Sequence, residues 1–268
     1  MAGFGKVEYR VVDGIALLTL VEPPANTYSY EMMRDLDAAI LEARMDRNVH
    51  VLVITGAGDK FFCAGATIGM LKDADPDYKY YFCLHANETL NRLEQTPKLV
   101  IAALNGHTVG GGLEVAMAAD IRIARKGGGK IGLPEVALGV LPGTGGTQRL
   151  ARLVGKARAI ELMIHGRLMT LEEAAVSGLV SEVWDEERLA GKSFLEAVLD
   201  YARQFTPPQK ASRAVGRIKR AVQSGLEAGF SEGLSIEREL QQLLFESVDA
   251  KEGIAANLEK RKPEFTGN

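Results

Sequence analysis

Short apolar runs alternate with longer amphipathic segments along the first 184 residues of the chain. The short runs, bounded by glycine, proline or charged residues, predict β-strands at residues 7–12, 15–20, 49–55, 99–104, 121–124, 130–133 and 179–184. Segments with apolar residues on one face predict helices at about 30–46 and 76–95, and the run Pro142–Gly146 opens another helix that ends at about residue 154. Beyond residue 184 the pattern is mostly helical, so we expect an α/β core followed by a helical tail.

Local signals support several of these boundaries. Asp13-Gly14 joins the first two apolar runs, and this dipeptide is typical of a β-hairpin turn. Ser29 is placed to cap the helix that begins at Tyr30. Thr170 and Glu173 have the spacing of a capping box, which predicts a short helix directly after them.

The segment from Asn105 to Asp120 is the most informative part of the chain. It follows the apolar run 99–104, passes through Gly110-Gly111-Gly112 and continues as small apolar residues broken only by Glu114. A strand that leads through glycines into a helix leaves backbone N–H groups without partners. These donors and a carboxylate in the first helical turn together suit chemistry next to a carbonyl group. The simpler alternative is that the glycines only permit tight strand–helix packing.

Glu114 has two interpretations. Its neighbours are apolar or small, so the helix is expected to be buried on most faces, and an unpaired buried carboxylate is costly. Such an acid is either held for function or paired with a base. Arg122, Arg125 and Arg149 are the candidate partners for the second interpretation.

Glu135 is a second lone acid among apolar residues. Pro134 precedes it and fixes the local backbone, which suits a side chain that must be aimed. The alternative is an acid at a helix start that local N–H groups satisfy. Two such acids beside glycine-rich helix starts strengthen the functional interpretation of both.

Composition narrows the class of protein. The chain has 268 residues, of which 46% are apolar, so one large domain or a core with a smaller appendage can be built. The net charge of −3 argues against a dedicated nucleic-acid binder. No apolar run is long enough to span a membrane, no secretory signal is recognisable, and two cysteines indicate a reducing compartment. We therefore expect a cytoplasmic protein.

Several common chemistries lack their sequence signals. Residues 143–148 resemble a dinucleotide fingerprint, but Gln148 stands where its last glycine should be. There is neither a phosphate-binding loop with the Gly-Lys-Ser/Thr ending nor a Gly-x-Ser-x-Gly elbow. The four histidines and two cysteines do not fall at metal-ligand spacing. We expect neither a metal nor a cofactor.

Two further features have structural interpretations. Cys63 lies near the candidate site, but a catalytic thiol needs a base beside it, so we interpret Cys63 as loop packing. Arg213, Arg217, Lys219 and Arg220 form a basic cluster on a predicted helix, and such clusters are usually solvated faces.

Ordered sequence blocks across nearly the whole chain resemble the crotonase (enoyl-CoA hydratase/isomerase) superfamily. The blocks are Phe62–Ala66, Asn105–Asp120, Leu133–Glu135 with Leu138–Leu150, and the tail around Glu252-Gly253 and Glu259–Pro263. The resemblance implies a spiral of ββα units that forms two nearly perpendicular sheets within residues 1–204. It also implies that residues 205–268 form a C-terminal helical region that builds trimers, often paired into hexamers, and contacts coenzyme A.

The resemblance implies a site as well. The backbone N–H groups of Ala66 and Gly111 would form the oxyanion hole for the thioester oxygen of an acyl-CoA. Glu114 would activate the water that attacks C3 of a trans-2-enoyl thioester, and Glu135 would protonate C2. Coenzyme A would be part of the substrate, and the expected substrate-binding residues are Ala64, Ala66, Thr67, Ile68, Gly110, Pro134, Gly143 and, from a neighbouring subunit, Lys260.

The resemblance is closest to the enoyl-CoA hydratases, which keep both acids and give a 3-hydroxyacyl-CoA in acyl-CoA and fatty acid metabolism. The alternatives are an isomerase or another acyl-CoA lyase of the superfamily, and a homologue that binds RNA through the basic helix around Arg217. Thr67, Asn257 and the segment 22–29 depart from the commonest hydratase pattern. Tyr78, Tyr80, Tyr81 and Phe82 fit either an acyl pocket or the core.

Overall fold

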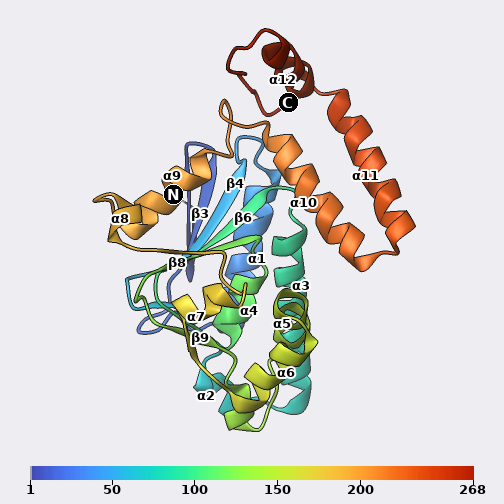
Figure 1. The fold of residues 1–268 in the computed structure, drawn as a ribbon. Helices are drawn as coiled ribbons and strands as arrows, with labels where there is room; N and C mark the ends of the chain where they lie inside the picture. The colour runs from blue at the N-terminus through green and yellow to red at the C-terminus, as the bar shows by residue number, and fades with distance from the viewer. Residues whose placement is uncertain (1) are drawn as a thin grey trace.

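The computed structural model describes residues 2–268, without the side chains of Ala2, Ile68 and Leu71. It is a mixed α/β structure with two sheets and a helical C-terminal part, as the sequence predicts (Figure 1). The strands are β1 (Ala2–Phe4), β2 (Val7–Val12), β3 (Ile15–Leu20), β4 (Val51–Gly56), β5 (Phe61–Cys63), β6 (Leu99–Leu104), β7 (His107–Val109), β8 (Ile121–Arg125), β9 (Lys130–Gly132), β10 (Met169–Thr170) and β11 (Glu182–Trp184).

The helices predicted at about 30–46 and 76–95, the helix ending at about 154 and the short helix after Thr170 are confirmed, whereas the sequence pattern does not predict the helices at 68–73 and 156–165. The helices of the structure are α1 (Tyr30–Met45), α2 (Ile68–Asp73), α3 (Pro76–Gln95), α4 (Gly111–Met117), the 3-10 helix η1 (Glu135–Leu138), α5 (Gly146–Val154), α6 (Lys156–His165), α7 (Leu171–Val176), α8 (Glu186–Leu189), α9 (Phe194–Arg203), α10 (Ser212–Glu227), α11 (Phe230–Phe245) and α12 (Val248–Leu258). The predicted caps are confirmed, because the Ser29 side chain accepts from the Met32 N–H and Thr170 and Glu173 form the capping box.

The larger sheet has the strand order β1-β2-β3-β4-β6-β8-β11, and the smaller has the order β10-β9-β7-β5. The predicted hairpin joins β2 to β3 through Asp13 and Gly14, whose φ values of 51° and 77° suit a primed turn. From β3 to β11 every pairing in the larger sheet is parallel. Parallel strands covered on both faces read as continuous apolar runs, which explains why β4 and β6 are buried at every position.

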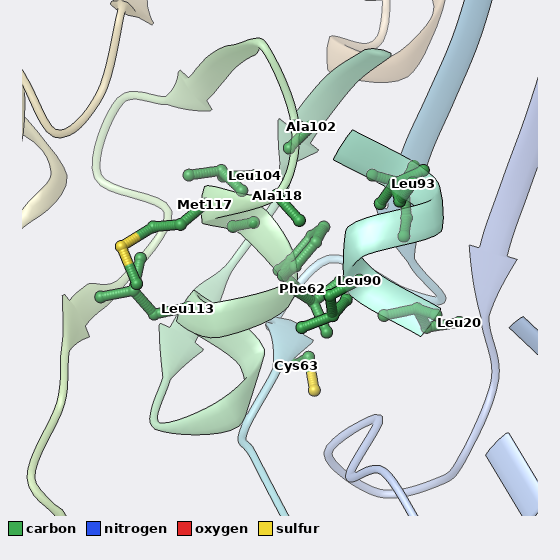
Figure 2. Close-up of a cluster of buried hydrophobic side chains, with 14 of the residues drawn as sticks. Leu20, Phe62, Cys63, Leu90, Leu93, Ala102, Leu104, Leu113, Met117 and Ala118 are labelled. Atoms are coloured by element: carbon green, nitrogen blue, oxygen red, sulfur yellow. The ribbon is translucent and has the colours of Figure 1, made fainter. Parts of the chain in front are cut away.

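The core lies on both faces of the larger sheet. Alternate residues of β4 divide between two apolar clusters, with Leu52 and Ile54 on one side and Val51 and Val53 on the other. The first cluster includes residues of α1, α3 and α4, and Figure 2 shows Phe62 beside Leu90 of α3. The second cluster is covered by α8 and α9. The helix α4 belongs to the first cluster and contacts α5 and the strands β5 and β7 of the smaller sheet.

The helix α10 is anchored to the core by a buried ion pair, which corrects one interpretation of the sequence. Lys219 is 8% exposed and its Nζ lies 2.9 Å from Asp120 Oδ2. The basic cluster that includes Lys219 is therefore not wholly a solvated face. The error arose because Asp120 is remote in sequence, and only the packed structure brings the two charges together.

The helices α11 and α12 extend away from the two sheets, whereas α10 packs beside β6 of the larger sheet (Figure 1). Asp249 in α12 fastens the chain end, since its carboxylate accepts hydrogen bonds from the backbone N–H groups of Thr266 at 2.7 Å and Gly267 at 2.9 Å. The domain boundary between residues 204 and 205 stays a prediction; it falls in the interval between α9 and α10.

Candidate active site

The glycines before α4 allow three chain segments to meet. Gly110 has a φ of 58°, and its N–H donates to the Gly132 carbonyl at 2.9 Å. A Cβ atom on Gly111 would overlap the Tyr28 hydroxyl, and one on Gly112 would overlap the Cys63 carbonyl. The tight-packing interpretation of these glycines is therefore correct. It is also compatible with a functional one, because the close packing brings the start of α4 against the loop after β5.

Ala66 in that loop pairs with Tyr28 in an isolated parallel bridge. The Tyr28 N–H donates to the Gly65 carbonyl at 2.9 Å, and the Thr67 N–H donates to the Tyr28 carbonyl at 3.1 Å. In such a bridge the N–H of the central residue, Ala66, points away from its partner strand. Across the part of the chain that the structure describes, neither the Ala66 N–H nor the Gly111 N–H has a protein partner.

These two N–H groups belong to adjacent backbone segments. A Cβ atom on Gly65 would lie 3.0 Å from the Gly111 nitrogen and 3.0 Å from the Val109 carbonyl oxygen. The residue before Ala66 thus touches the backbone of the residue that begins α4. Unpartnered donors on neighbouring segments are the arrangement that an oxyanion hole requires.

Glu114 is almost fully buried, with 2% of its surface exposed, and it is held by one turn of the chain. Its Oε1 accepts from the backbone N–H of Thr144 at 2.8 Å and of Gly146 at 2.7 Å. Its Oε2 accepts from the Thr144 hydroxyl. Three donors of this kind satisfy a buried carboxylate without a cation.

The alternative in which an arginine neutralises Glu114 is wrong. Arg122 donates to the carbonyls of Leu179 and Ala119 at 2.7 and 2.6 Å. Arg125 donates to the Asp59 carbonyl, and Arg149 pairs with Glu94 at 2.8 Å. All three arginines have other partners.

Glu135 opens η1 and reaches the same helix start. Its Oε1 lies 3.0 Å from the position that a Cβ atom on Gly110 would take. Its Oε2 is buried and has no hydrogen-bond partner among the described residues. Burial first, and the nearby negative charge of Glu114 in addition, raise the pKa of Glu135 to about 7, while its own backbone N–H and the charge of Lys79 oppose the increase. The alternative in which nearby N–H groups form hydrogen bonds to both oxygens of Glu135 is therefore wrong, because Oε2 has no such partner.

The two acids thus share a site but not an environment. One is hydrogen bonded at both oxygens, and the other keeps a buried oxygen free and titrates near neutrality. Pairs of carboxyl groups with contrasting surroundings are typical of sites in which one acts as a base and the other as an acid.

The other expected binding residues lie around this centre with one exception. The Ala64 N–H donates to the Ala25 carbonyl at 3.0 Å, and the Thr67 hydroxyl donates to Thr27 Oγ1 at 3.2 Å. Pro134 precedes η1, and the Gly143 carbonyl accepts from Asn87 Nδ2 at 3.4 Å. Ile68 is another expected substrate-binding residue, and its side chain lies outside the part of the chain that the structure describes.

Lys260 is the exception. It follows α12 with a φ of 57°, in the C-terminal part that extends away from the sheets (Figure 1). In a single chain Lys260 therefore lies apart from Glu114 and Glu135. Its predicted contact with coenzyme A is one made from a neighbouring subunit.

Sequence reasoning missed two residues of this centre, Thr144 and Tyr28. Thr144 lies in the turn Pro142–Gly146, which falls within the family block Leu138–Leu150 and partly resembles a nucleotide-binding loop, but neither pattern points to Thr144 itself. The signal that could have identified it is a hydroxyl residue among glycines whose N–H groups open a helix. The sequence pattern marks Tyr28, which is 3% exposed, only as part of the segment 22–29 that departs from the commonest hydratase pattern.

The remaining candidates have structural roles. Cys63 is fully buried, and burial raises the pKa of its thiol to about 12, so its interpretation as packing is confirmed. Phe82 belongs to the core and stacks on Tyr28 with ring centroids 5.8 Å apart, whereas Tyr80 and Tyr81 are exposed.

Residues 2–268 contain no group of His, Cys, Asp or Glu side chains arranged to hold a metal ion. None of the helices described is long and apolar enough to cross a bilayer.

Comparisons with known proteins identify the family of this chain. The family model described as enoyl-CoA hydratase/isomerase matches residues 10–268. A protein of Rhizobium meliloti named probable enoyl-CoA hydratase is 42% identical over 257 residues, which cover 94% of each chain. A short-chain-enoyl-CoA hydratase of Clostridium acetobutylicum is 36% identical over 251 residues, with 93% of each chain covered.

Solved structures give the same answer. The crystal structure of an enoyl-CoA hydratase from Geobacillus kaustophilus superposes with a TM-score of 0.93 at 44% identity, covering 98% of this chain and 97% of the other. The match spans both sheets and the C-terminal helices. The chain described here belongs to the enoyl-CoA hydratase/isomerase family.

Proposed function

We propose that this chain catalyses the syn addition of water to a trans-2-enoyl-CoA, giving a 3-hydroxyacyl-CoA, with no cofactor beyond the coenzyme A of the substrate. The observation that carries the proposal is the pair of unlike carboxyl groups, Glu114 and Glu135, beside two unpartnered backbone N–H groups. Relatives named crotonyl-CoA hydratase and short-chain-enoyl-CoA hydratase support the choice of reaction.

The oxyanion donors stabilise the intermediate. Attack of water on C3 of a conjugated thioester moves negative charge onto the thioester oxygen. In the proposal, the N–H groups of Ala66 and Gly111 bind that oxygen, and each fixed donor is worth roughly 10²–10³ in rate. Because both donors are main-chain atoms, the departure at Thr67 leaves them in place.

Glu114 is suited to the role of base. A carboxylate offers about four lone-pair sites, and three protein donors occupy three of those of Glu114. One acceptor site remains, on Oε2, which can take one hydrogen of the attacking water. The base therefore orients a single water molecule as well as accepting its proton.

Glu135 is suited to the role of acid. Its pKa of about 7 leaves a large protonated fraction at neutral pH, and its unpartnered Oε2 is free to carry that proton. It donates the proton to C2 as the enolate collapses. A positioned proton transfer of this kind contributes roughly 10²–10⁴ in rate.

Replacement of each acid tests the proposal. We expect Glu114→Gln and Glu135→Gln each to lower the hydration of crotonyl-CoA by roughly 10²–10⁴, followed as loss of the conjugated enoyl absorbance. Binding of butyryl-CoA, which cannot be hydrated, should be retained and serves as the control. Near-normal turnover in either variant would remove that residue from the mechanism.

An isomerase is the nearest alternative, and a direct comparison separates it. The resemblance implies that an isomerase commonly needs only one of the two acids, whereas both are present here. The wild-type protein should therefore act on crotonyl-CoA faster than it converts a 3-enoyl-CoA into the 2-enoyl isomer. The opposite order of rates would favour the isomerase.

We also propose that the C-terminal helices join three chains into a trimer, and that two trimers can pair into a hexamer. We further propose that the protein is cytoplasmic. Large apolar side chains are exposed on α10 and α11, including Leu226 at 80% and Phe230 at 83%. Such residues along a connected helical surface are typical of an interface between subunits. Sedimentation analysis should give three or six times the monomer mass, and Lys260 would then reach the coenzyme A of a neighbouring subunit.

A further inference from the structure

Tyr28 is the residue of the unusual segment 22–29 that the proposed chemistry leaves unexplained. It is a buried tyrosine, 3% exposed, placed between the two parts of the candidate oxyanion hole. Its backbone, its ring and its hydroxyl each contact a different part of the site. Each contact has a separate consequence.

The backbone of Tyr28 fixes the first oxyanion donor. Its N–H and carbonyl make the two hydrogen bonds, to Gly65 and Thr67, that bracket Ala66. This pairing directs the Ala66 N–H toward the opposite side of the loop. The first donor therefore depends on Tyr28 through main-chain atoms, which a change of side chain does not remove.

The ring of Tyr28 is held by tight packing. It stacks on Phe82 at an interplanar angle of 23°, and its hydroxyl end lies where a Cβ atom on Gly111 would be. The ring cannot swing toward α4, because the backbone of Gly111 already touches it. The hydroxyl is therefore fixed in position.

The hydroxyl of Tyr28 supports Glu114 through Thr144, and the direction of the hydrogen bonds follows from counting protons. Thr144 has one hydroxyl hydrogen, which it donates to Glu114 Oε2, because a carboxylate can only accept. The Tyr28 hydroxyl lies 3.1 Å from Thr144 Oγ1 and must then be the donor. Burial, with the negative charge of Glu114, raises the pKa of Tyr28 well above its usual value, so this donor stays protonated.

We propose that Tyr28 is a positioning residue for hydration, whose main chain holds the Ala66 N–H and whose hydroxyl, through Thr144, holds the Glu114 carboxylate. The inference rests on the proposed function. Its physical content is that Tyr28 orders Thr144, and that Thr144 leaves one lone pair of Glu114 for water. In this proposal Tyr28 acts only through Ala66 and Thr144.

The test is a double-mutant cycle between Tyr28 and Thr144, measured on crotonyl-CoA hydration. Tyr28→Phe removes only the hydroxyl, and we expect kcat to fall roughly three- to tenfold, the value of one neutral hydrogen bond. Thr144→Val removes the donor to the carboxylate, and we expect a loss of about 10- to 100-fold. Since Tyr28 acts through Thr144, the double variant should be no slower than Thr144→Val alone.

Three controls separate positioning from a general structural effect. Thr144→Ser keeps the hydroxyl and should restore kcat to near the wild-type value. Tyr9→Phe is the matched control, because Tyr9 is also buried and its hydroxyl has no partner among the described residues. It should leave kcat unchanged. The KM for crotonyl-CoA and the affinity for butyryl-CoA should stay near wild type in all the variants of Tyr28 and Thr144.

The possible results are decisive. A Tyr28→Phe protein with wild-type kcat, or losses that multiply in the double variant, would overturn the inference while the hydratase function stands. A Tyr28→Phe protein that does not fold would make the hydroxyl structural, and this also overturns it. A wild-type protein without hydration activity would remove the proposed function and the inference together.

Discussion

The hydration rate should depend on pH through the raised pKa of Glu135. Burial and the charge of Glu114 hold this pKa at about 7 in the ligand-free protein, against an ordinary value of 4.5. The proposed acid works only when protonated. We therefore expect the plot of kcat/KM against pH to be flat below pH 7 where Glu135 is protonated, and to fall tenfold per pH unit above it. This falling part is called the alkaline limb. It reflects the pKa of the ligand-free protein, because kcat/KM reports the free enzyme.

The buried environment of Glu135 greatly increases the fraction of this carboxyl group that is protonated at neutral pH. A carboxyl group of pKa 4.5 would be only about 0.3% protonated at pH 7, whereas one of pKa about 7 is half protonated. The raised pKa thus multiplies the protonated fraction at neutral pH by roughly 160. This factor is lost if Glu135 is exposed to water.

Lys79 provides a way to move the alkaline limb without touching the reacting groups. Its positive charge lowers the pKa of Glu135, so Lys79→Met should shift the limb to higher pH by roughly 0.2 to 0.5 unit, the effect of one solvent-screened charge. Lys72→Met, which removes an exposed lysine of α2 that does not contribute to this pKa, is the matched control and should leave the limb in place.

The assay is initial-rate hydration of crotonyl-CoA between about pH 5.5 and 9. The alkaline limb should be present in the wild type and absent from the residual activity of Glu135→Gln. A wild-type kcat/KM that stays flat through pH 7, or a Lys79→Met limb that moves to lower pH, would refute the reasoning about Glu135.

Three further predictions concern stability. A raised folded-state pKa means that the folded protein binds more protons between pH 4.5 and about 7, so wild-type stability declines as pH rises through that window. Glu135→Gln should remove this decline and gain roughly 1 to 2 kcal/mol at pH 8 after allowance for solvent screening, measured by urea unfolding at pH 5 and 8. Lys219→Met leaves Asp120 buried without its cation and should cost about 3 to 5 kcal/mol in urea unfolding. Gly111→Ala should abolish hydration and lower the melting temperature, whereas Gly69→Ala, whose Cβ atom meets nothing within 4 Å, should be neutral in both measurements.

Each stability prediction has a contrary outcome. An equal stability of the wild type and Glu135→Gln at both pH values would show that burial does not perturb this carboxyl group. A loss below about 1 kcal/mol for Lys219→Met would place the ion pair in solvent. Full activity in Gly111→Ala would mean that the start of α4 has room for a side chain.

The sequence predicts the parts of this fold that local chemistry determines. The Asp13-Gly14 turn, the Ser29 cap and the Thr170 capping box each act within a few residues, and the structure confirms all three. The apolar runs of β4 and β6 are legible for the same reason, because strands covered on both faces need no partner to be recognised.

The errors and omissions concern contacts between distant segments. Glu114 is held by Thr144, 30 positions along the chain, and an arginine was the more obvious partner by charge alone. Lys219 is buried through Asp120, 99 positions away, and its neighbours in sequence resemble a solvated helix face. Periodicity does not carry this pairwise information.

The two thiols of the chain differ in accessibility, and this difference is of practical use. Cys63 is fully buried in the core, and burial raises the pKa of its thiol to about 12. Alkylating reagents should therefore not modify it in the folded protein. Cys83 is only partly covered, and its sulfur lies 3.1 Å from the point where a Cβ atom on Gly143 would be, one residue from Thr144. A fluorophore attached there would report thioester binding without any engineered cysteine.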